Sequence, residues 1–212
     1  MQRRNFIAAL LASTLLEACS KKIKMPAIPP GQIVLAFGDS VTFGTGASPG
    51  EDWPSLLGAQ TGWQMINAGI PGDTAESGKT RIKALLDEYR PALVFVEMGG
   101  NDFLRRSAAS VVKEDLRRIV QEIRQTGSQV VLIGVPELSL LAVVASKASD
   151  SPIYRELANE EKIPLIGDVF SEVLSQPALR SDKIHPNAEG YRQMATDIFA
   201  QLKKLGLSSE PG

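Results

Sequence analysis

Short apolar runs alternate with amphipathic stretches along most of the chain, and this alternation sets the predicted fold. The runs are continuous rather than alternating in polarity, as expected for strands covered on both faces. The predicted strands are Ile33–Phe37, Gln64–Ala68, Leu93–Met98, Val130–Val135 and Pro164–Ile166. Strands separated by helical segments predict an α/β domain with a mainly parallel sheet.

Apolar residues at helical spacing predict helices between and after these strands. The three stripes are Ile82, Leu85, Leu86 and Tyr89; Leu116, Ile119, Val120 and Ile123; and Tyr191, Met194, Ala195, Ile198, Phe199, Leu202 and Leu205. Asp73 and Glu76 have the spacing of a capping box that begins the first helix. Gly127 lies where the second helix is expected to end. The segment Leu138–Asp150 fits either a helix or an apolar loop, so its type stays open.

The N-terminal residues have a pattern of their own. Arg3 and Arg4 precede the apolar run Phe6–Leu16, which is followed by small residues and Cys19. This is the layout of an export signal, and the run is shorter than the roughly 20 apolar residues that a membrane-spanning helix needs. The paired arginines also resemble a twin-arginine signal. We therefore expect residues 1–19 to direct export.

Cys19 is the only cysteine of the chain, so an intramolecular disulfide is excluded. The stretch LEAC that ends at Cys19 resembles the bacterial lipobox, in which the cysteine is lipidated and becomes the mature N-terminus, although Glu17 departs from that motif. Ordinary signal cleavage is the alternative. The basic, proline-rich residues 20–31 are expected to form a flexible tether, residues 32–206 the folded domain and residues 207–212 a tail. The expected location is the bacterial cell envelope, as a lipoprotein facing the periplasm or the cell surface.

Composition fits one enzyme-sized domain and excludes an obvious nucleic-acid surface. The 212 residues are 43% hydrophobic, enough to bury the core of a single domain. The 23 basic and 24 acidic residues are scattered along the chain and give a formal net charge of -1. No basic cluster of the kind that binds DNA or RNA is present in the sequence.

The segment FGDSVTFGTG follows the first predicted strand and contains the candidate nucleophile, Ser40. Ligands of open α/β sheets bind beyond the carboxyl ends of the strands, so function is expected in this segment. Its glycines match neither the dinucleotide fingerprint nor the phosphate loop. The G-x-S-x-G elbow is also missing, because Thr42 stands two residues after Ser40.

A serine nucleophile needs a base, and the chain has one histidine, His185, in the segment DKIHPN. Asp182, three residues earlier, could hold the imidazole in the required tautomer as the third member of a triad. A packed or surface histidine is the alternative. Acyl transfer also needs donors for the developing oxyanion. NAGIPGDT offers the backbone N–H of Gly69 and GGND the amide of Asn101, although both segments are also ordinary turn sequences.

The segments GDSV, NAGIPGDT, GGND and DKIHPN, in this order, resemble the motifs of the SGNH or GDSL hydrolase superfamily. The resemblance is greatest to its thioesterase I, lysophospholipase L1 and arylesterase branch. Val41 stands where the family name has leucine. The resemblance implies a flavodoxin-like three-layer α/β/α sandwich with a five-stranded parallel sheet. It implies no metal and no organic cofactor.

The resemblance also assigns expected roles to residues of this chain. Ser40 would be the nucleophile, His185 the general base and then acid, and Asp182 the carboxylate that orients the histidine. The oxyanion hole would combine the N–H groups of Ser40 and Gly69 with the amide of Asn101. Asp39, Asp73 and Asp102 are interpreted as residues that shape loops or cap helices.

The expected activity is hydrolysis of carboxylic esters or thioesters, such as aryl esters, acyl thioesters or lysophospholipids, through an acyl-Ser40 intermediate. The partner is then a small ester, thioester or lipid. One alternative is an O-acetyl esterase acting on a carbohydrate or the cell wall with the same triad. Another is a non-catalytic flavodoxin-like module that binds a phosphorylated ligand. The sequence leaves the physiological substrate, the acyl length and the oligomeric state open.

Overall fold

The computed structural model describes residues 25–137 and 148–208. Its strands are β1 (Ile33–Gly38), β2 (Gln64–Gly69), β3 (Leu93–Glu97), β4 (Gln129–Ile133) and β5 (Leu165–Ile166). The longer helices are α2 (Trp53–Thr61), α3 (Ala75–Tyr89), α5 (Ala109–Gln125), α7 (Pro152–Glu161) and α9 (Ala188–Leu205). The short helical segments are α1 (Ser40–Phe43), α4 (Gly100–Leu104), α8 (Val169–Leu174) and the 3₁₀ turn η1 (Pro177–Leu179).

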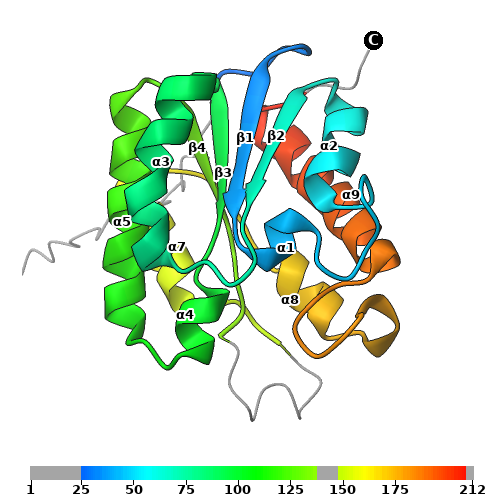
Figure 1. The fold of residues 1–212 in the computed structure, drawn as a ribbon. Helices are drawn as coiled ribbons and strands as arrows, with labels where there is room; N and C mark the ends of the chain where they lie inside the picture. The colour runs from blue at the N-terminus through cyan, green and yellow to red at the C-terminus, as the bar shows by residue number, and fades with distance from the viewer. Residues whose placement is uncertain (1–24, 138–147, 209–212) are drawn as a thin grey trace, which may run out of the picture.

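The strands form a parallel sheet in the order β2-β1-β3-β4-β5. Figure 1 shows α3 and α5 on one side of this sheet and α2 and α9 on the other. The predicted three-layer α/β/α sandwich with a flavodoxin-like strand order is therefore confirmed. Each predicted strand is present and begins and ends within two residues of its expected bounds.

The sheet is buried at its centre and partly open at β2. Every residue of β3 is buried, and β1 is buried from Val34 onward. Strand β2 pairs only with β1, and its residues are half-buried or exposed, so the expectation of two covered faces fails for this edge strand. Trp53 of α2 packs edge-on against Phe95 of β3, with ring centroids 5.7 Å apart. This contact joins one helical layer to the central strand.

The apolar stripes predicted from the sequence are the core-facing sides of α3, α5 and α9. Their fully buried members are Ile82, Leu86, Leu116, Ile119, Val120, Ile123, Tyr191, Met194, Ala195, Ile198 and Leu202. Helix α5 ends at Gln125 and Gly127 follows with φ +85°, as expected for a helix stop. Both sides of the sheet are thus covered by the helices that the 3.6-residue period predicted.

The start of α3 differs from the prediction. Its N-cap is Thr74, and the capping box joins Thr74 to Ser77 rather than Asp73 to Glu76. The Asp73 carboxylate instead accepts the N–H of Thr74 at 3.1 Å and the hydroxyl of Ser77. Sequence spacing alone could not decide between two overlapping cap patterns one residue apart.

The folded part of the chain extends beyond the expected limits of residues 32–206 at both ends. Ile28, expected to lie in the flexible tether, is buried, and its carbonyl accepts the indole N–H of Trp63 at 3.0 Å. Leu207, expected in the tail, is also buried, and its carbonyl accepts the N–H of Ile28 at 2.9 Å. Both apolar side chains are buried at the amino edge of the sheet. The local sequence pattern does not predict this burial.

Several predictions fall on parts of the chain outside the described residues. These are the export signal with Cys19, the first residues of the tether, and most of the segment Leu138–Asp150. Within residues 25–137 and 148–208, no helix is both long enough and apolar enough to cross a bilayer.

Candidate active site

Ser40 lies at the carboxyl edge of the sheet, in the one-turn helix α1 that directly follows β1. The turn is closed at both ends. The Asp39 side chain caps it by accepting the N–H of Val41 at 3.0 Å, and Gly44 ends it with φ +99°, a conformation that favours glycine. Two cap contacts therefore hold the serine at the end of a strand that is buried from Val34 onward.

His185 and Asp182 come from the loop before α9 and meet Ser40 across 145 residues of sequence. His185 Nε2 lies 3.0 Å from Ser40 Oγ, and His185 Nδ1 lies 2.7 Å from Asp182 Oδ2. The other oxygen of Asp182 accepts the backbone N–H groups of Ile184 and His185, both at 2.8 Å. The three side chains that the sequence nominated are thus joined in one hydrogen-bonded chain.

The charge of Asp182 determines the tautomer of the histidine. Partial burial alone would raise the pKa of Asp182, but the hydrogen bonds from the His185 ring and from the Ile184 and His185 backbone outweigh it and lower that pKa. An ionised carboxylate only accepts hydrogen bonds, so Nδ1 of His185 carries the proton. In the neutral imidazole, Nε2 is then the nitrogen that can accept the proton of the Ser40 hydroxyl.

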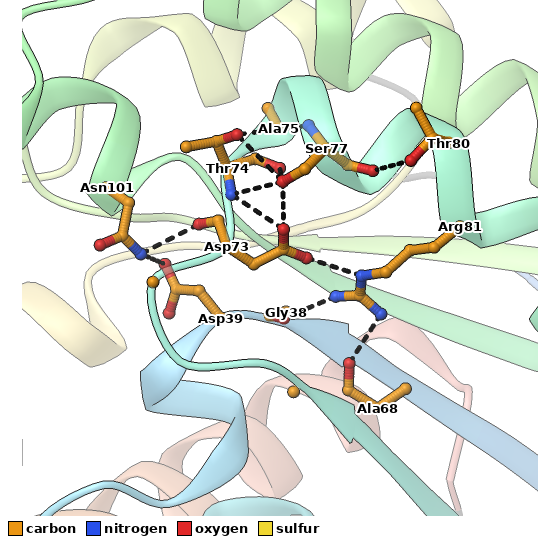
Figure 2. Close-up of polar contacts among 12 residues, drawn as sticks. Gly38, Asp39, Ala68, Asp73, Thr74, Ala75, Ser77, Thr80, Arg81 and Asn101 are labelled. Carbon is orange, nitrogen blue, oxygen red and sulfur yellow. Dashed lines mark hydrogen bonds and ion pairs between the residues drawn. The ribbon is translucent and has the colours of Figure 1, made fainter.

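The two further oxyanion donors expected from the sequence lie beside Ser40, and each already has partners. Both protons of the Asn101 amide are used, because Nδ2 donates to the Asp73 carbonyl at 3.0 Å and to Asp39 Oδ2 at 3.2 Å (Figure 2). The Gly69 N–H donates to Asn67 Oδ1 at 3.0 Å. An oxyanion would have to share or replace these acceptors.

Gly69 packs directly on the turn that carries Ser40. A Cβ built at this position would lie 2.2 Å from the backbone nitrogen of Phe43, so a side chain cannot be accommodated without moving α1. The predicted glycine thus serves close packing between the loop after β2 and the turn after β1.

The surface around Ser40 is apolar on several sides. A small hollow beside it has Val41, Leu104, Phe170 and Ile184 as its apolar lining. Its polar lining is Asp39, Ser40, Asn101 and His185. Leu104 is 44% exposed, and two other large apolar side chains near the same edge, Phe43 and Ile70, are 55% and 48% exposed. Apolar contact area is therefore available to a group bound at Ser40.

A buried acid behind the nucleophile turn was not found from the sequence. Glu97 ends β3 and is fully buried; its Oε2 accepts the Thr42 hydroxyl at 2.8 Å, and its Oε1 has no hydrogen-bond partner among the described residues. Burial is the main cause that raises the pKa of Glu97 well above its usual value, followed by the nearby charge of Asp39. The available signal was the single charged residue that closes the apolar run LVFVE.

Asp39 has the predicted loop-shaping role, and its pKa differs from the ordinary value for aspartate. Burial raises its pKa from 3.8 to about 6, although the hydrogen bond from Val41 acts in the opposite direction. Asp102 has a capping role across loops, because its carboxylate accepts the Ala75 N–H at 2.9 Å at the start of α3. The residues 25–137 and 148–208 contain no cluster of three or more side chains suited to hold a metal ion.

We expect Asp39→Asn to change the pH dependence of stability. Because the pKa of Asp39 is higher in the folded chain, its contribution to stability is fully present below about pH 4 and is lost as pH rises through about 6. Asparagine cannot ionise, so the difference in Tm between variant and wild type should shift in favour of the variant between pH 4 and 7. Thermal unfolding at several pH values measures this difference, with Asp197→Asn, a half-buried position on α9, as control. A difference that stays constant with pH would contradict the prediction.

Comparison with known proteins agrees with this geometry. The GDSL-like Lipase/Acylhydrolase family matches residues 36–193. Thioesterase 1/protease 1/lysophospholipase L1 of Escherichia coli K12 is 34% identical over 179 residues, which cover 81% of this chain and 84% of that protein. Esterase TesA of Pseudomonas aeruginosa is 29% identical over 204 residues, covering 92% of this chain and 100% of the relative. A crystal structure of TesA aligns with a TM-score of 0.71 at 31% identity, covering 82% of this chain and 99% of that one.

The matched region includes all the residues of the candidate site, from Ser40 to His185. It also includes strands β2 to β5 and the end of β1, and the relatives are esterases and a thioesterase of similar length. On these grounds the chain belongs to the GDSL-like lipase/acylhydrolase family and is a carboxylic ester hydrolase.

Proposed function

We propose that the protein hydrolyses acyl esters and thioesters through an acyl-Ser40 intermediate, with aryl esters, acyl thioesters and lysophospholipids as its substrate class. The observation that carries this proposal is the chain of contacts from Ser40 Oγ to His185 Nε2 at 3.0 Å and from His185 Nδ1 to Asp182 at 2.7 Å. A hydroxyl within reach of a neutral imidazole nitrogen is the arrangement that makes serine nucleophilic.

In the first half of the reaction, Ser40 Oγ attacks the carbonyl carbon while His185 Nε2 takes its proton. The imidazolium, stabilised by the Asp182 carboxylate, then protonates the leaving alcohol or thiol as the tetrahedral intermediate collapses to the acyl-enzyme. In the second half, His185 takes a proton from water, which attacks the acyl carbonyl. Return of that proton to Ser40 Oγ releases the carboxylic acid and regenerates the enzyme.

The N–H groups of Ser40 and Gly69 and the amide of Asn101 would stabilise the oxyanion in both halves. Hydrogen bonds in a site often tighten only when the reacting group is bound. We infer that the oxyanion shares the Asn101 proton that now reaches Asp39 at 3.2 Å, the longer of the two Asn101 contacts. It likewise competes with Asn67 for the N–H of Gly69.

Covalent labelling tests the nucleophile. An organophosphonate should modify the protein once, and mass spectrometry of the digested protein should locate the adduct on Ser40. The Ser40→Ala variant should stay unlabelled under the same conditions. Absence of label on Ser40 in the folded wild-type protein would favour the non-catalytic binding module.

The exposed apolar side chains Phe43, Ile70 and Leu104 favour acyl groups longer than acetyl. A series of aryl esters from acetyl upward should therefore give a kcat/KM that rises with the first added methylenes, because each buried methylene contributes about 0.8 kcal/mol. Hydrolysis by Ser40→Ala gives the background. A steep fall beyond acetyl would instead favour the O-acetyl esterase.

We also propose that the enzyme is exported to the bacterial cell envelope and anchored through a lipid on Cys19. This rests on the paired arginines, the short apolar run and the LEAC segment. Growth with a labelled fatty acid should label the wild-type protein and leave Cys19→Ser unlabelled. Equal absence of label in both would favour ordinary signal cleavage.

A further inference from the structure

Arg81 lies in α3, and its guanidinium sits behind the loops that carry the site (Figure 2). Its three nitrogens donate to three different residues, one at the end of β1 and two in the stretch that ends β2 and leads to α3. Nε donates to Asp73 Oδ2 at 2.6 Å, Nη1 to the Ala68 carbonyl at 2.9 Å and Nη2 to the Gly38 carbonyl at 2.9 Å. The side chain is 19% exposed and its guanidinium carbon lies 4.0 Å from the centre of the Phe37 ring. These hydrogen bonds and the Phe37 ring thus surround one guanidinium, on a side chain that is mostly buried.

The two backbone carbonyls that Arg81 contacts lie next to groups of the candidate site. The Ala68 carbonyl belongs to the same planar peptide unit as the N–H of Gly69, and the two groups point in opposite directions. A hydrogen bond that fixes the Ala68 oxygen therefore fixes the direction of the Gly69 N–H. The Gly38 carbonyl likewise belongs to the peptide unit of Asp39, directly before Ser40.

The contact between Arg81 and Asp73 affects Asn101 indirectly. Arg81 holds the carboxylate of Asp73, and the backbone carbonyl of the same residue accepts the Asn101 amide at 3.0 Å (Figure 2). The ion pair also neutralises a carboxylate close to the site, whose charge would otherwise oppose an oxyanion.

We infer that Arg81 is the positioning residue of the oxyanion hole. Its guanidinium fixes the carbonyls of Gly38 and Ala68, in the segments that present Ser40 and Gly69, and it acts on Asn101 indirectly by holding the side chain of Asp73. This rests on the proposed function, since it assumes that these groups bind an oxyanion. Arg81 does not touch the substrate. It acts by aiming donors, and a hydrogen bond to the Ala68 oxygen also polarises the peptide so that Gly69 donates more strongly.

Lysine cannot perform this role. Its ammonium is a single point charge, whereas the planar guanidinium presents donors in fixed directions to acceptors on different sides. Arg81→Lys therefore keeps the positive charge beside Asp73 and loses the simultaneous hold on Gly38 and Ala68. We expect kcat for an aryl ester to fall about 10- to 100-fold, the usual cost of misplaced catalytic groups, with little change in KM.

The matched control is Lys79→Met, two residues earlier on the same helix. Lys79 is also a partly buried cation of α3, but it pairs with the side chain of Asp115 on α5, whereas Arg81 also bonds to the backbone carbonyls of Gly38 and Ala68. This variant should lower Tm and leave kcat unchanged at a temperature where it is folded. A loss of stability without a loss of turnover in Lys79→Met then gives the effect expected from an ion pair that serves only the fold.

A double-mutant cycle with Asn101→Ala separates positioning from folding. If Arg81 acts through the oxyanion donors, Arg81→Lys should cost less in kcat when Asn101 has already been truncated. Should Arg81→Lys fail to fold, Asp73→Asn breaks the same ion pair at almost constant size and takes its place in the cycle. An unchanged kcat in the folded variant, or the same loss in both backgrounds, would overturn the inference.

The labelling experiment distinguishes failure of the proposed function from failure of the role of Arg81. If the wild-type protein does not react at Ser40 with an organophosphonate, the proposed function fails. If it reacts normally and Arg81→Lys keeps the wild-type kcat, only the role of Arg81 fails.

Discussion

His185→Ala is expected to lower kcat by about 100- to 10,000-fold, the usual contribution of a positioned acid and base. His185 is the only histidine of the chain, and its Nε2 is 3.0 Å from the Ser40 hydroxyl. No other imidazole can therefore take over its position. Because the imidazole acts mainly in the transition state, KM should change much less than kcat. Steady-state kinetics with an aryl ester at pH 7 to 8 measure both.

Two controls accompany this variant. Ser40→Ala gives the rate without a nucleophile, and near-native far-UV circular dichroism and Tm show that His185→Ala is folded. Added imidazole should restore part of the lost turnover, because it supplies the missing base in solution. Near-wild-type turnover in His185→Ala without imidazole would refute the assignment of the base.

Asn101→Ala is expected to lower kcat by about 100- to 1,000-fold, the usual effect of removing one donor from an oxyanion hole. The effect should appear in kcat and in the affinity for a trifluoromethyl ketone, which forms a tetrahedral adduct. It should appear much less in KM, because the ground-state carbonyl needs the donor less. Kinetics and inhibition constants for the same enzyme samples provide the comparison.

Asn101 also contacts Asp73 and Asp39, so its truncation will lower stability by about 1 kcal/mol for a lost hydrogen bond. Activity must therefore be measured well below the Tm of the variant. The exposed Asn159→Ala, on α7, is the matched control and should affect neither quantity. If Asn101→Ala loses stability but keeps its turnover, the amide is a loop contact and not an oxyanion donor.

The sheet was predictable because buried parallel strands appear in the sequence as short, continuous apolar runs. Strands β1 and β3 follow this rule except at one end each, where Ile33 is half-buried and Glu97 is acidic, and the long apolar stripe of α9 follows its helical counterpart. The errors lie where a side chain is buried by residues distant in the sequence. Ile28 is covered through Trp63 and Leu207, and no local pattern announces such a contact.

The candidate site could be predicted from its residue types and their order. The residues that support it could not. Ser40, Asp182 and His185 carry distinctive chemistry, so they could be nominated without knowing that they meet. Arg81 and Glu97 look like an ordinary helix residue and the end of a strand. Arg81 does follow Ser77 by four residues, which places these two on one face of α3, and Asp73 lies four residues before Ser77, just ahead of the helix. Their roles depend on tertiary contacts that only the folded chain brings together.

The contact between Ile28 and Leu207 brings the two ends of the folded region together at the amino edge of the sheet, and Ser40 lies at the carboxyl edge. A short linker between these ends would therefore permit circular permutation, with new termini opened in a surface loop far from the nucleophile. By the same geometry, a solid support attached near Leu207 would leave the carboxyl edge of the sheet, with Ser40, facing the solution.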